Sequence, residues 1–369
     1  MAAKPIRRWC EMTTSSIKDP VSAIRKFLAG LPMLSDSSEG SRKDSAGQVL
    51  CAMVDAGLDR LSLPGGGQTL QRWRALAAVA AHDLSLAKLY EAHTDALAIL
   101  AEAGVENELP LRVWGVWCAE PPQARLDIHH PAAEDAGAVV LDGVKAWCSG
   151  ANAITHAVVS GWNRDGRPCL AAVDLDQSGI TVTNEGWHAV GMAETASVDV
   201  LFDNVRGVAI GGADFYTGRP GFWHGGAGIA ACWYGAAAQL ALYLRQHLNE
   251  QSNPLALAQL GRADVALSAC AASLRAAAQH IDTAPTSDAY RPAMRVRLIA
   301  EDAANQVMQA FGRALGAAPL CRDPWAARMM ADLPVFLRQS HADRDLEALA
   351  HSLLQRDGEA ENGEEEWQL

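Results

Sequence analysis

The residues best suited to proton transfer lie near the C-terminal end of the chain. His341 is followed by Asp345 four positions later and preceded by Arg338 three positions earlier. A carboxylate one helical turn from an imidazole can orient it, and histidine changes charge near neutral pH. His341 is therefore a candidate proton acceptor, with Arg338 beside it. An equally open interpretation is that Ser340 or Asp343 caps a helix whose solvated first turn includes His341.

A second candidate group lies in the middle of the chain. Trp147, Cys148 and Ser149 place an indole, a thiol and a hydroxyl side by side, directly after a predicted hairpin. The plain interpretation is that Trp147 is a core aromatic and Ser149 a turn hydroxyl. Three further histidines, at positions 130, 188 and 224, cannot be placed relative to either group from sequence alone.

Short strands must position the central group. Asp142-Gly143 favours the positive φ angles of a type I′ turn and predicts a hairpin between residues 138–141 and 144–147, and Asp165-Gly166 predicts a second hairpin. Strand-like runs lie at 111–118, 138–141, 144–147, 156–162, 168–173, 179–183 and 197–202. This recurrence indicates a compact β-domain, a small barrel or sandwich.

Helical patterns lie on both sides of this β-domain. Asp19-Pro20 is an N-cap followed by proline at the first helical position, and Asp83 or Ser85 is expected to re-cap the pattern between residues 70 and 103. Helices are predicted after Pro20, at 48–56, twice within 70–103, and at 221–248, 255–282, 294–315 and 343–354. We predict a helical domain (1–110), a β-domain (111–212), a helical bundle (213–355) and a disordered acidic tail (356–369).

Composition is that of an ordinary globular chain of two or three domains. Of 369 residues, 49% are hydrophobic and 20% charged, and the formal net charge is -12. Six of the acidic residues lie in the last 13 positions, so the acidity is concentrated in the tail. No clustered basic face suggests nucleic-acid binding.

The cysteines and apolar segments give no sign of a metal site, a signal peptide or a membrane anchor. Eight cysteines occur without a C-x-x-C pair or a zinc-like histidine spacing, which predicts free thiols and a cytoplasmic location. Residues 1–20 lack an apolar core segment. Residues 225–244 carry no formal charge, but their alanine and glycine content favours a helix buried in a bundle over a membrane span. The glycines after Pro64 lack the Lys-Ser/Thr of a phosphate-binding loop, so we interpret them as a turn.

The order of helices, strands and helices, with five particular segments, resembles the acyl-CoA dehydrogenase superfamily. The segments are Asp-Leu-Ser-Leu-Ala-Lys-Leu-Tyr (83–90), Val-Trp-Cys-Ala-Glu-Pro (116–121), Gly-Val-Lys-Ala-Trp-Cys-Ser-Gly (143–150), Gly-Met-Ala-Glu-Thr (191–195) with Phe-Asp-Asn-Val (202–205), and Gln-Ala-Phe-Gly-Arg-Ala-Leu-Gly (309–316). The resemblance spans about residues 20–355. It implies a multidomain α+β fold: a helical domain, a β-barrel-like domain and a C-terminal four-helix bundle, with FAD between the last two.

The resemblance also implies roles for particular residues. Ser149 would donate to flavin N5, the atom that accepts hydride, and Trp147 would pack against the flavin ring, with Cys148 between them. The backbone of Trp117, Cys118 and Ala119 would meet the pyrimidine edge of the ring. Gln309 and Gly312 would reach the FAD of a neighbouring subunit in a homodimer or homotetramer.

Two departures from the family pattern stand out. Arg338 or Gln339 occupies the position of the family's catalytic glutamate, and residues 222–242, where a minority of the family carries the base, contain no acid. Leu248 stands where the family's arginine contacts the FAD pyrophosphate. Losing such a charge-assisted contact would weaken FAD binding by about 1.5 to 3 kcal/mol.

Three functions remain compatible with these residues. The preferred one is an FAD-dependent dehydrogenase acting on an acyl thioester, with His341 or another residue as the base and, as the resemblance implies, an electron-transferring flavoprotein as acceptor. The second is a flavin-dependent monooxygenase, in which a serine and a histidine near N5 assist the reaction of reduced flavin with oxygen. The third is a non-catalytic relative that keeps the fold as an oligomerisation surface.

Overall fold

The N-terminal part of the chain is helical, as predicted. The computed structural model describes residues 19–31, 45–105, 112–131 and 137–354. Its first helices are α1 (Pro20–Ala29), α2 (Ser45–Asp55), α3 (Thr69–His82) and α4 (Leu84–Glu102). The Asp19 carboxylate accepts the backbone N–H groups of Val21 and Ser22, and the Asp83 carboxylate accepts that of Leu86 at 2.7 Å. The two predicted aspartate caps are confirmed.

The middle of the chain forms a closed β-sheet. Its strands are β1 (Trp114–Trp117), β2 (Leu126–His129), β3 (Ala138–Cys148), β4 (His156–Trp162), β5 (Pro168–Asp174), β6 (Ile180–Val182) and β7 (Val198–Ile210). The ladder runs β1-β4-β2-β3-β7-β5, and β5 also pairs with β4, so the sheet closes on itself. Closure leaves few unpaired edges and gives the barrel-like domain that was predicted.

One predicted hairpin is confirmed and the other is wrong. Asp165-Gly166 turns β4 into β5, and the Asn163 side chain accepts two backbone N–H groups of the turn. Asp142-Gly143 instead lies inside the continuous strand β3, at an irregularity in its pairing with β7. Gly143 has φ +127°, and a Cβ there would lie 2.3 Å from the carbonyl oxygen of Arg125 on the neighbouring strand. The glycine therefore permits a bulge and a close strand approach.

The C-terminal half is a helical bundle. It contains α5 (Phe215–Gly218), α6 (Gly221–Gln246), α7 (Pro254–Thr283), α8 (Tyr290–Leu315), α9 (Ala318–Arg322), α10 (Pro324–Phe336) and α11 (Asp343–Leu354). Three of these helices, α5, α9 and α10, were not predicted from the sequence. Helices α6, α7 and α8 pack on one another, and α10 packs on α6. Helix α10 begins at an Asp323 cap followed by Pro324, the same signal that was recognised at Pro20.

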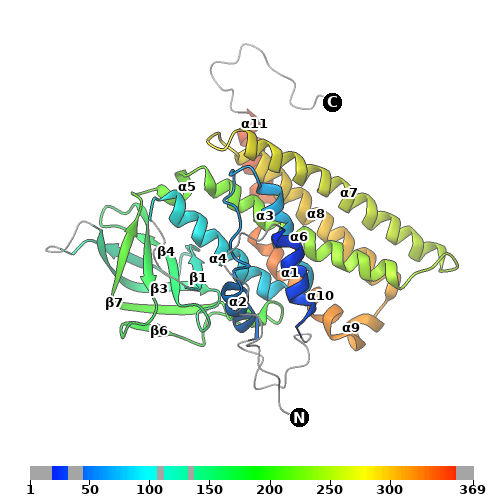
Figure 1. Ribbon diagram of the computed structural model, residues 1–369, viewed down its shortest axis with the longest axis horizontal. Coiled ribbons are helices and arrows are strands. Elements are labelled where there is room, and N and C mark those ends of the chain that lie inside the picture. The colour runs from blue at the N-terminus through cyan, green and yellow to red at the C-terminus, as the bar shows by residue number, and fades with distance from the viewer. Residues whose placement is uncertain (1–18, 32–44, 106–111, 132–136, 355–369) are drawn as a thin grey trace, which may run out of the picture.

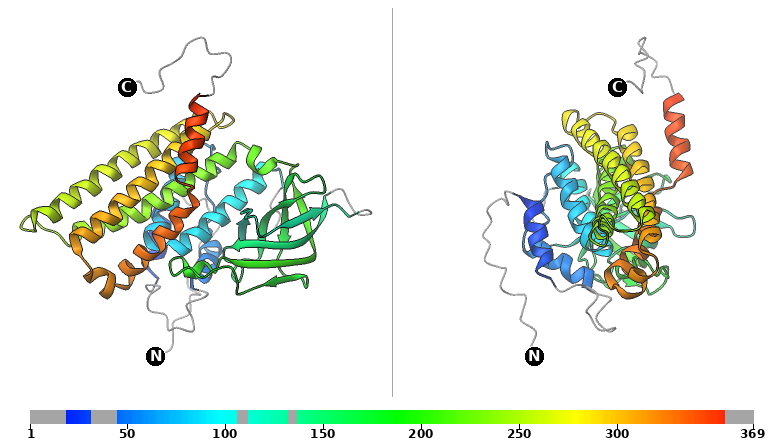
Figure 2. Two further views of the ribbon diagram at one scale, coloured as in Figure 1. Left: turned by 180° about the vertical axis from the view of Figure 1, so that it is seen from behind. Right: turned by 90° about the vertical axis from the view of Figure 1, so that its right-hand side faces the viewer.

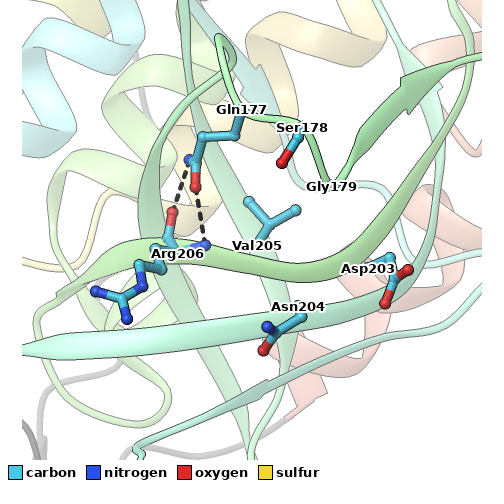
Figure 3. Close-up of a pocket in the computed structure, with 7 residues that line it drawn as sticks. All are labelled: Gln177, Ser178, Gly179, Asp203, Asn204, Val205 and Arg206. Carbon is cyan, nitrogen blue, oxygen red and sulfur yellow. Dashed lines mark hydrogen bonds between the residues drawn. The ribbon is translucent and has the colours of Figure 1, made fainter.

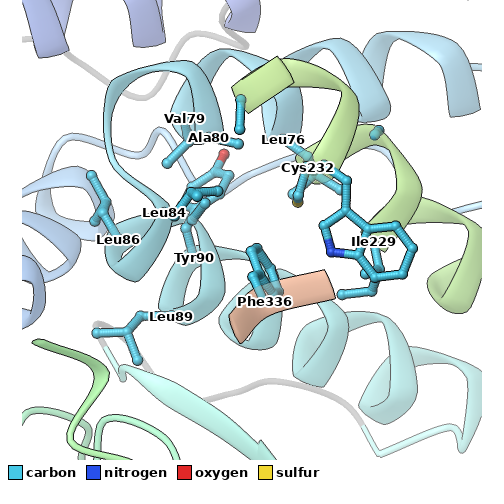
Figure 4. Close-up of a cluster of buried hydrophobic side chains, with 14 of the residues drawn as sticks. Leu76, Val79, Ala80, Leu84, Leu86, Leu89, Tyr90, Ile229, Cys232 and Phe336 are labelled. Carbon is cyan, nitrogen blue, oxygen red and sulfur yellow. The ribbon is translucent and has the colours of Figure 1, made fainter. Parts of the chain in front are cut away.

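Two of these helices, α6 and α7, are long and apolar enough to cross a membrane by length and composition. Most of the apolar window of α6 is buried, as expected for 225–244, whereas that of α7 is largely exposed. Helix α6 packs so closely on α3 that a Cβ on Gly235 would lie 2.2 Å from the carbonyl oxygen of Ala77. Figure 4 shows the apolar side chains from α3, α4, α6 and α10 that fill this junction.

Helix α4 joins the two halves of the molecule. Figures 1 and 2 show the sheet at one end, the long helices α6 to α8 at the other, and α4 between them. Helix α4 contacts β1 on one side and α6 on another. Segments distant in sequence therefore meet along α4, and a cavity of about 800 Å³ lies there.

Candidate active site

A cavity of about 800 Å³ lies where α4, the barrel and the bundle meet. The barrel contributes the ends of β1 and β3, residues of β4 and β5, and the 187–197 loop to its wall. The helices contribute α4, the first turns of α6, two residues of α8 and the segment from 335 to 345. Aromatic side chains form much of it: Trp147, Trp162, Trp187, Tyr216, Phe222, Trp223 and Phe336. A mostly apolar cavity with a few convergent polar groups is typical of a small-molecule site.

Ser149 lies on this wall as the end of a chain of hydroxyl groups. Its Oγ lies 2.7 Å from Ser197 Oγ, which lies 2.8 Å from Thr195 Oγ1. Thr195 donates to the carbonyl oxygen of Met192 at 2.8 Å, so the hydroxyl hydrogen of Ser197 points either to Thr195 or to Ser149. When it points to Ser149, Ser149 can donate its own hydrogen to a ligand in the cavity.

Trp147 reaches the cavity because its backbone leaves the strand. Its φ is +57°, which is uncommon for a bulky residue, and the pairing of β3 with β7 shifts register between Lys145 and Cys148. The side chain is 49% exposed, so a large indole lies open on the cavity wall. Such an outlier suggests a functional role for the side chain.

The other residues predicted to hold the cofactor fall into two groups. Cys118 and Ala119 line the cavity, and burial raises the pKa of the Cys118 thiol to about 11, so it stays protonated at neutral pH. The side chains of Trp117 and Cys148 are buried behind the wall. The Trp117 indole N–H donates to the carbonyl oxygen of Ser149 at 3.1 Å and so positions the serine from behind.

A buried lysine supports the segment after β1. Lys145 is 1% exposed, and its Nζ donates to Glu120 at 2.5 Å and to Ser160 at 2.8 Å. The indole N–H of Trp162 donates to the other carboxylate oxygen of Glu120 at 3.2 Å. Glu120 follows directly on Cys118 and Ala119, so this network fixes the position of their backbone.

His341 and Asp345 form the predicted pair at the rim of the cavity. The imidazole Nδ1 lies 3.3 Å from Asp345 Oδ1, and the His341 backbone N–H donates to Oδ2 at 2.9 Å. A neutral imidazole that donates from Nδ1 leaves Nε2 as its proton acceptor. His341 is 66% exposed, so the imidazole is open to solvent as well as to the cavity.

Arg338 also lies on the cavity wall, but its charge is engaged. Its guanidinium donates to Glu301 of α8 at 2.5 Å. Arg297, one turn earlier on α8, donates to the carbonyl oxygens of Gly226 and Gln339. These contacts hold the segment that carries Arg338 and His341 against the bundle. A catalytic role for either residue stays a prediction.

Two cavity acids were missed from the sequence. Glu91 and Asp95 lie one turn apart on α4, and both face the cavity. Burial raises the pKa of Glu91, and Lys88 at 3.2 Å opposes that shift. The available signal was the i, i+4 spacing of two acids in a helix that is otherwise buried nearly all round.

Several candidates lie outside this cavity. Gln309 and Gly312 lie on α8 away from it, and their predicted contact with a neighbouring subunit stays a prediction. His130 and His188 are exposed, while His224 is buried but does not line the cavity. Among the described residues, no group of three histidines, cysteines or acids could hold a metal ion, and the seven described cysteines are free.

A second hollow lies on the barrel surface between the 177–179 turn and β7. In Figure 3 the Gln177 side chain lies against the backbone of Arg206, to which its amide group makes two hydrogen bonds. Both bonds tie the turn to the strand. The hollow has no cluster of side chains suited to catalysis.

No known family description and no curated protein matches the sequence, but solved structures match over most of their length. TdsC from Paenibacillus sp. A11-2 with FMN gives a TM-score of 0.76 at 15% identity, covering 91% of this chain and 97% of that one. KijD3 with FMN and an amino-sugar nucleotide gives 0.74 at 18% identity, covering 94% and 97%. A glutaryl-CoA dehydrogenase from Mycobacterium smegmatis with FADH2 gives 0.74 at 15% identity, covering 91% and 93%. At such identities the likeness concerns architecture: the chain has the acyl-CoA dehydrogenase fold.

Proposed function

We propose that this chain is a flavin-dependent oxidoreductase of the monooxygenase type. The observation that carries the proposal is that Ser149, Trp147 and the His341–Asp345 pair face one cavity, while the position expected to hold a catalytic carboxylate is occupied by Arg338 or Gln339. Among proteins of this fold, TdsC is a dibenzothiophene monooxygenase.

The cavity offers what an isoalloxazine ring needs. The exposed indole of Trp147 provides a flat surface for the ring, and Ser149 provides a hydroxyl whose hydrogen can turn toward a ligand. Cys118 and Ala119, held in place by the buried Lys145, provide backbone groups for the polar edge of the ring. A bound reduced flavin would supply the activation of oxygen, with one oxygen atom passing to the substrate and the other to water.

The identity of the flavin is a separate question. The sequence resemblance implies FAD, but Leu248 has no group that could bond to a pyrophosphate. FMN lacks that pyrophosphate and would lose nothing by this substitution. We therefore expect FMN to bind at least as tightly as FAD, and equilibrium dialysis against each flavin would compare them.

In the monooxygenase proposal, the protein's own residues handle protons and position the substrate. Asp345 holds the Nδ1 proton of His341, so Nε2 is free to accept a proton and later return it. Ser149, backed by Ser197, stabilises the flavin position by donating to it. The aromatic wall keeps bulk water from the reacting atoms.

A second candidate function is dehydrogenation of an acyl thioester, our preference from the sequence. One observation favours it: Glu91 is a buried cavity carboxylate whose pKa is raised by burial, as suits a proton acceptor. In that case Glu91 on α4 would take the place of the missing glutamate. An electron-transferring flavoprotein as electron acceptor remains an expectation of the dehydrogenase alone. A homodimer or homotetramer and a cytoplasmic location remain expectations attached to either proposal.

Two spectroscopic measurements separate these functions. The flavin-loaded protein is titrated anaerobically with acyl-CoA thioesters, and it is then reduced chemically and exposed to oxygen. We expect the thioesters to leave the flavin band unchanged, and His341→Ala to alter the reoxidation rate at least tenfold. Bleaching of the band by a thioester that is lost in Glu91→Gln would establish the dehydrogenase instead. Failure to bind any flavin would contradict both proposals and favour a non-catalytic protein.

A further inference from the structure

The inner wall of the cavity contains two oppositely charged side chains with unused hydrogen-bonding atoms. Asp95 Oδ1 and Arg219 Nε are both buried, and neither has a hydrogen-bond partner among the described residues. Asp95 Oδ1 lies 4.0 Å from the nearest nitrogen of Arg219, which is close enough for attraction but too far for a hydrogen bond. Both residues line the cavity.

Arg219 has a hydrogen-bond partner that helps to hold the fold together, whereas Asp95 Oδ1 has none among the described residues. The Arg219 guanidinium donates to Glu102 at 2.8 Å, and Glu102 also accepts the backbone N–H of Gly221 at the start of α6. These bonds join α4 to α6 without Asp95. Opposite Asp95, residue 225 is glycine, and a Cβ there would lie 2.7 Å from Oδ1. Glycine at 225 thus lets the start of α6 pack directly against Asp95 Oδ1, while the Asp95 side chain, 13% exposed, still lines the cavity.

We propose that Asp95 and Arg219 form a subsite for a hydrogen-bond-donating end group of the substrate, a hydroxyl or an amine. The proposal rests on the proposed function and deepens it by naming a substrate class. The Asp95 carboxylate accepts hydrogen bonds and cannot donate them, so it can bond to such groups but not to a carbonyl, which can only accept and could bond to Arg219 alone. Tyr216, Phe222 and Trp223 beside it favour a flat apolar body. The substrate class is therefore a small aromatic alcohol or amine.

The subsite has a charged neighbour whose effect can be anticipated. Glu91, one turn before Asp95, is paired with Lys88 at 3.2 Å, and the buried Arg72 lies behind the same helix. The negative charges of Glu91 and Asp95 are matched by the positive charges of Lys88 and Arg72, so the net charge of the subsite does not by itself select a ligand. The unused acceptor on Asp95 decides it, because a buried acceptor gains most from a ligand that brings a donor.

Binding of three small probes tests the proposal without relying on turnover. Toluene, benzyl alcohol and benzylamine share one ring and differ in the end group. Their binding to the flavin-loaded protein is measured by calorimetry, with quenching of the cavity tryptophans as a second readout. We expect benzyl alcohol and benzylamine to bind at least tenfold more tightly than toluene, and Asp95→Asn to remove most of that preference.

The matched control is Asp214→Asn, which changes another cavity carboxylate that is half exposed and paired with Arg167. It should leave the preference intact. Equal binding of the three probes, no binding of any, or an unchanged preference in Asp95→Asn would each overturn the proposal. The visible flavin spectrum of every variant is recorded first, so loss of the cofactor, which would count against the proposed function, is distinguished from loss of the subsite. Asp95→Ala serves as a second variant if Asp95→Asn does not fold.

Discussion

Breaking the ion pair between Lys145 and Glu120 is expected to be the most destabilising single change near the cavity. Lys145 is 1% exposed, and Glu120 and the hydroxyl of Ser160 are its hydrogen-bond partners. Glu120→Ala would leave a buried ammonium group with one neutral partner. Removing one member of a buried pair costs about 3 to 5 kcal/mol. Because 27% of the Glu120 side chain is exposed and water can enter in its place, we expect the lower end, about 3 kcal/mol.

The pair can be distinguished from either residue alone by a double-mutant cycle in urea unfolding. Lys145→Met removes the buried charge, so Glu120→Gln should cost much less in that background than in the wild type. We expect a coupling free energy of about 2 kcal/mol. The control is Asp214→Asn, which breaks the exposed pair with Arg167 and should change the stability little, because solvent screens such a pair. A loss below about 1 kcal/mol for Glu120→Ala, or simple additivity in the cycle, would refute this reasoning.

Three further changes test other parts of the structure. Gly235→Ala should destabilise the protein by about 2 kcal/mol or more in urea unfolding, because the new Cβ would clash with the backbone of α3. Gly312→Ala is the control: its Cβ would have no atom within 4 Å, so the substitution should be neutral or stabilising. Burial and nearby carboxylates raise the pKa of Asp332 to about 7. Between about pH 4 and 7 the folded state therefore keeps a proton on Asp332 that the unfolded state has lost. As the pH rises through this range, the free energy of unfolding should fall by up to about 4 kcal/mol. Asp332→Asn should therefore match the wild type in thermal unfolding at pH 4 and exceed it at pH 8. Ser149→Ala should weaken flavin binding by about 1 kcal/mol in equilibrium dialysis, while Ser197→Ala, which leaves the Ser149 hydroxyl in place, should weaken it less.

The helices were predictable where the signals are local. Asp19 and Asp83 cap helices through bonds to residues two or three positions away, so the sequence contains the whole motif. Asp142-Gly143 shows the limit of such signals. A type I′ turn and a bulge both accept a glycine with positive φ. Gly143 forms a bulge because the carbonyl group of Arg125, just before β2, packs against it. Local chemistry therefore predicted the unusual backbone but not its role.

The candidate site was predictable in part for the same reason. The imidazole of His341 and the carboxylate of Asp345 are four positions apart and do pair, as their spacing predicted, although His341 lies just before α11 and not on it. Glu91 and Asp95 have the same spacing, yet nothing in the sequence shows that α4 is buried on nearly all sides with one part open to a cavity. Which buried acids are available for chemistry depends on how the bundle and the barrel pack against α4.

The position of the proton acceptor can change in this fold without disturbing the backbone that carries it. Arg338 or Gln339 stands where the resemblance places a carboxylate. The ion pair of Arg338 with Glu301 on α8 holds the segment before α11 against the bundle. Among the groups that line the cavity, His341 at the rim and Glu91 on α4 are the two that the proposed functions use as proton acceptors. They approach a bound ring from different elements, and a different geometry of proton transfer permits a different reaction on the same flavin. We therefore expect His341→Ala to affect the reaction of a monooxygenase, and Glu91→Gln that of a dehydrogenase.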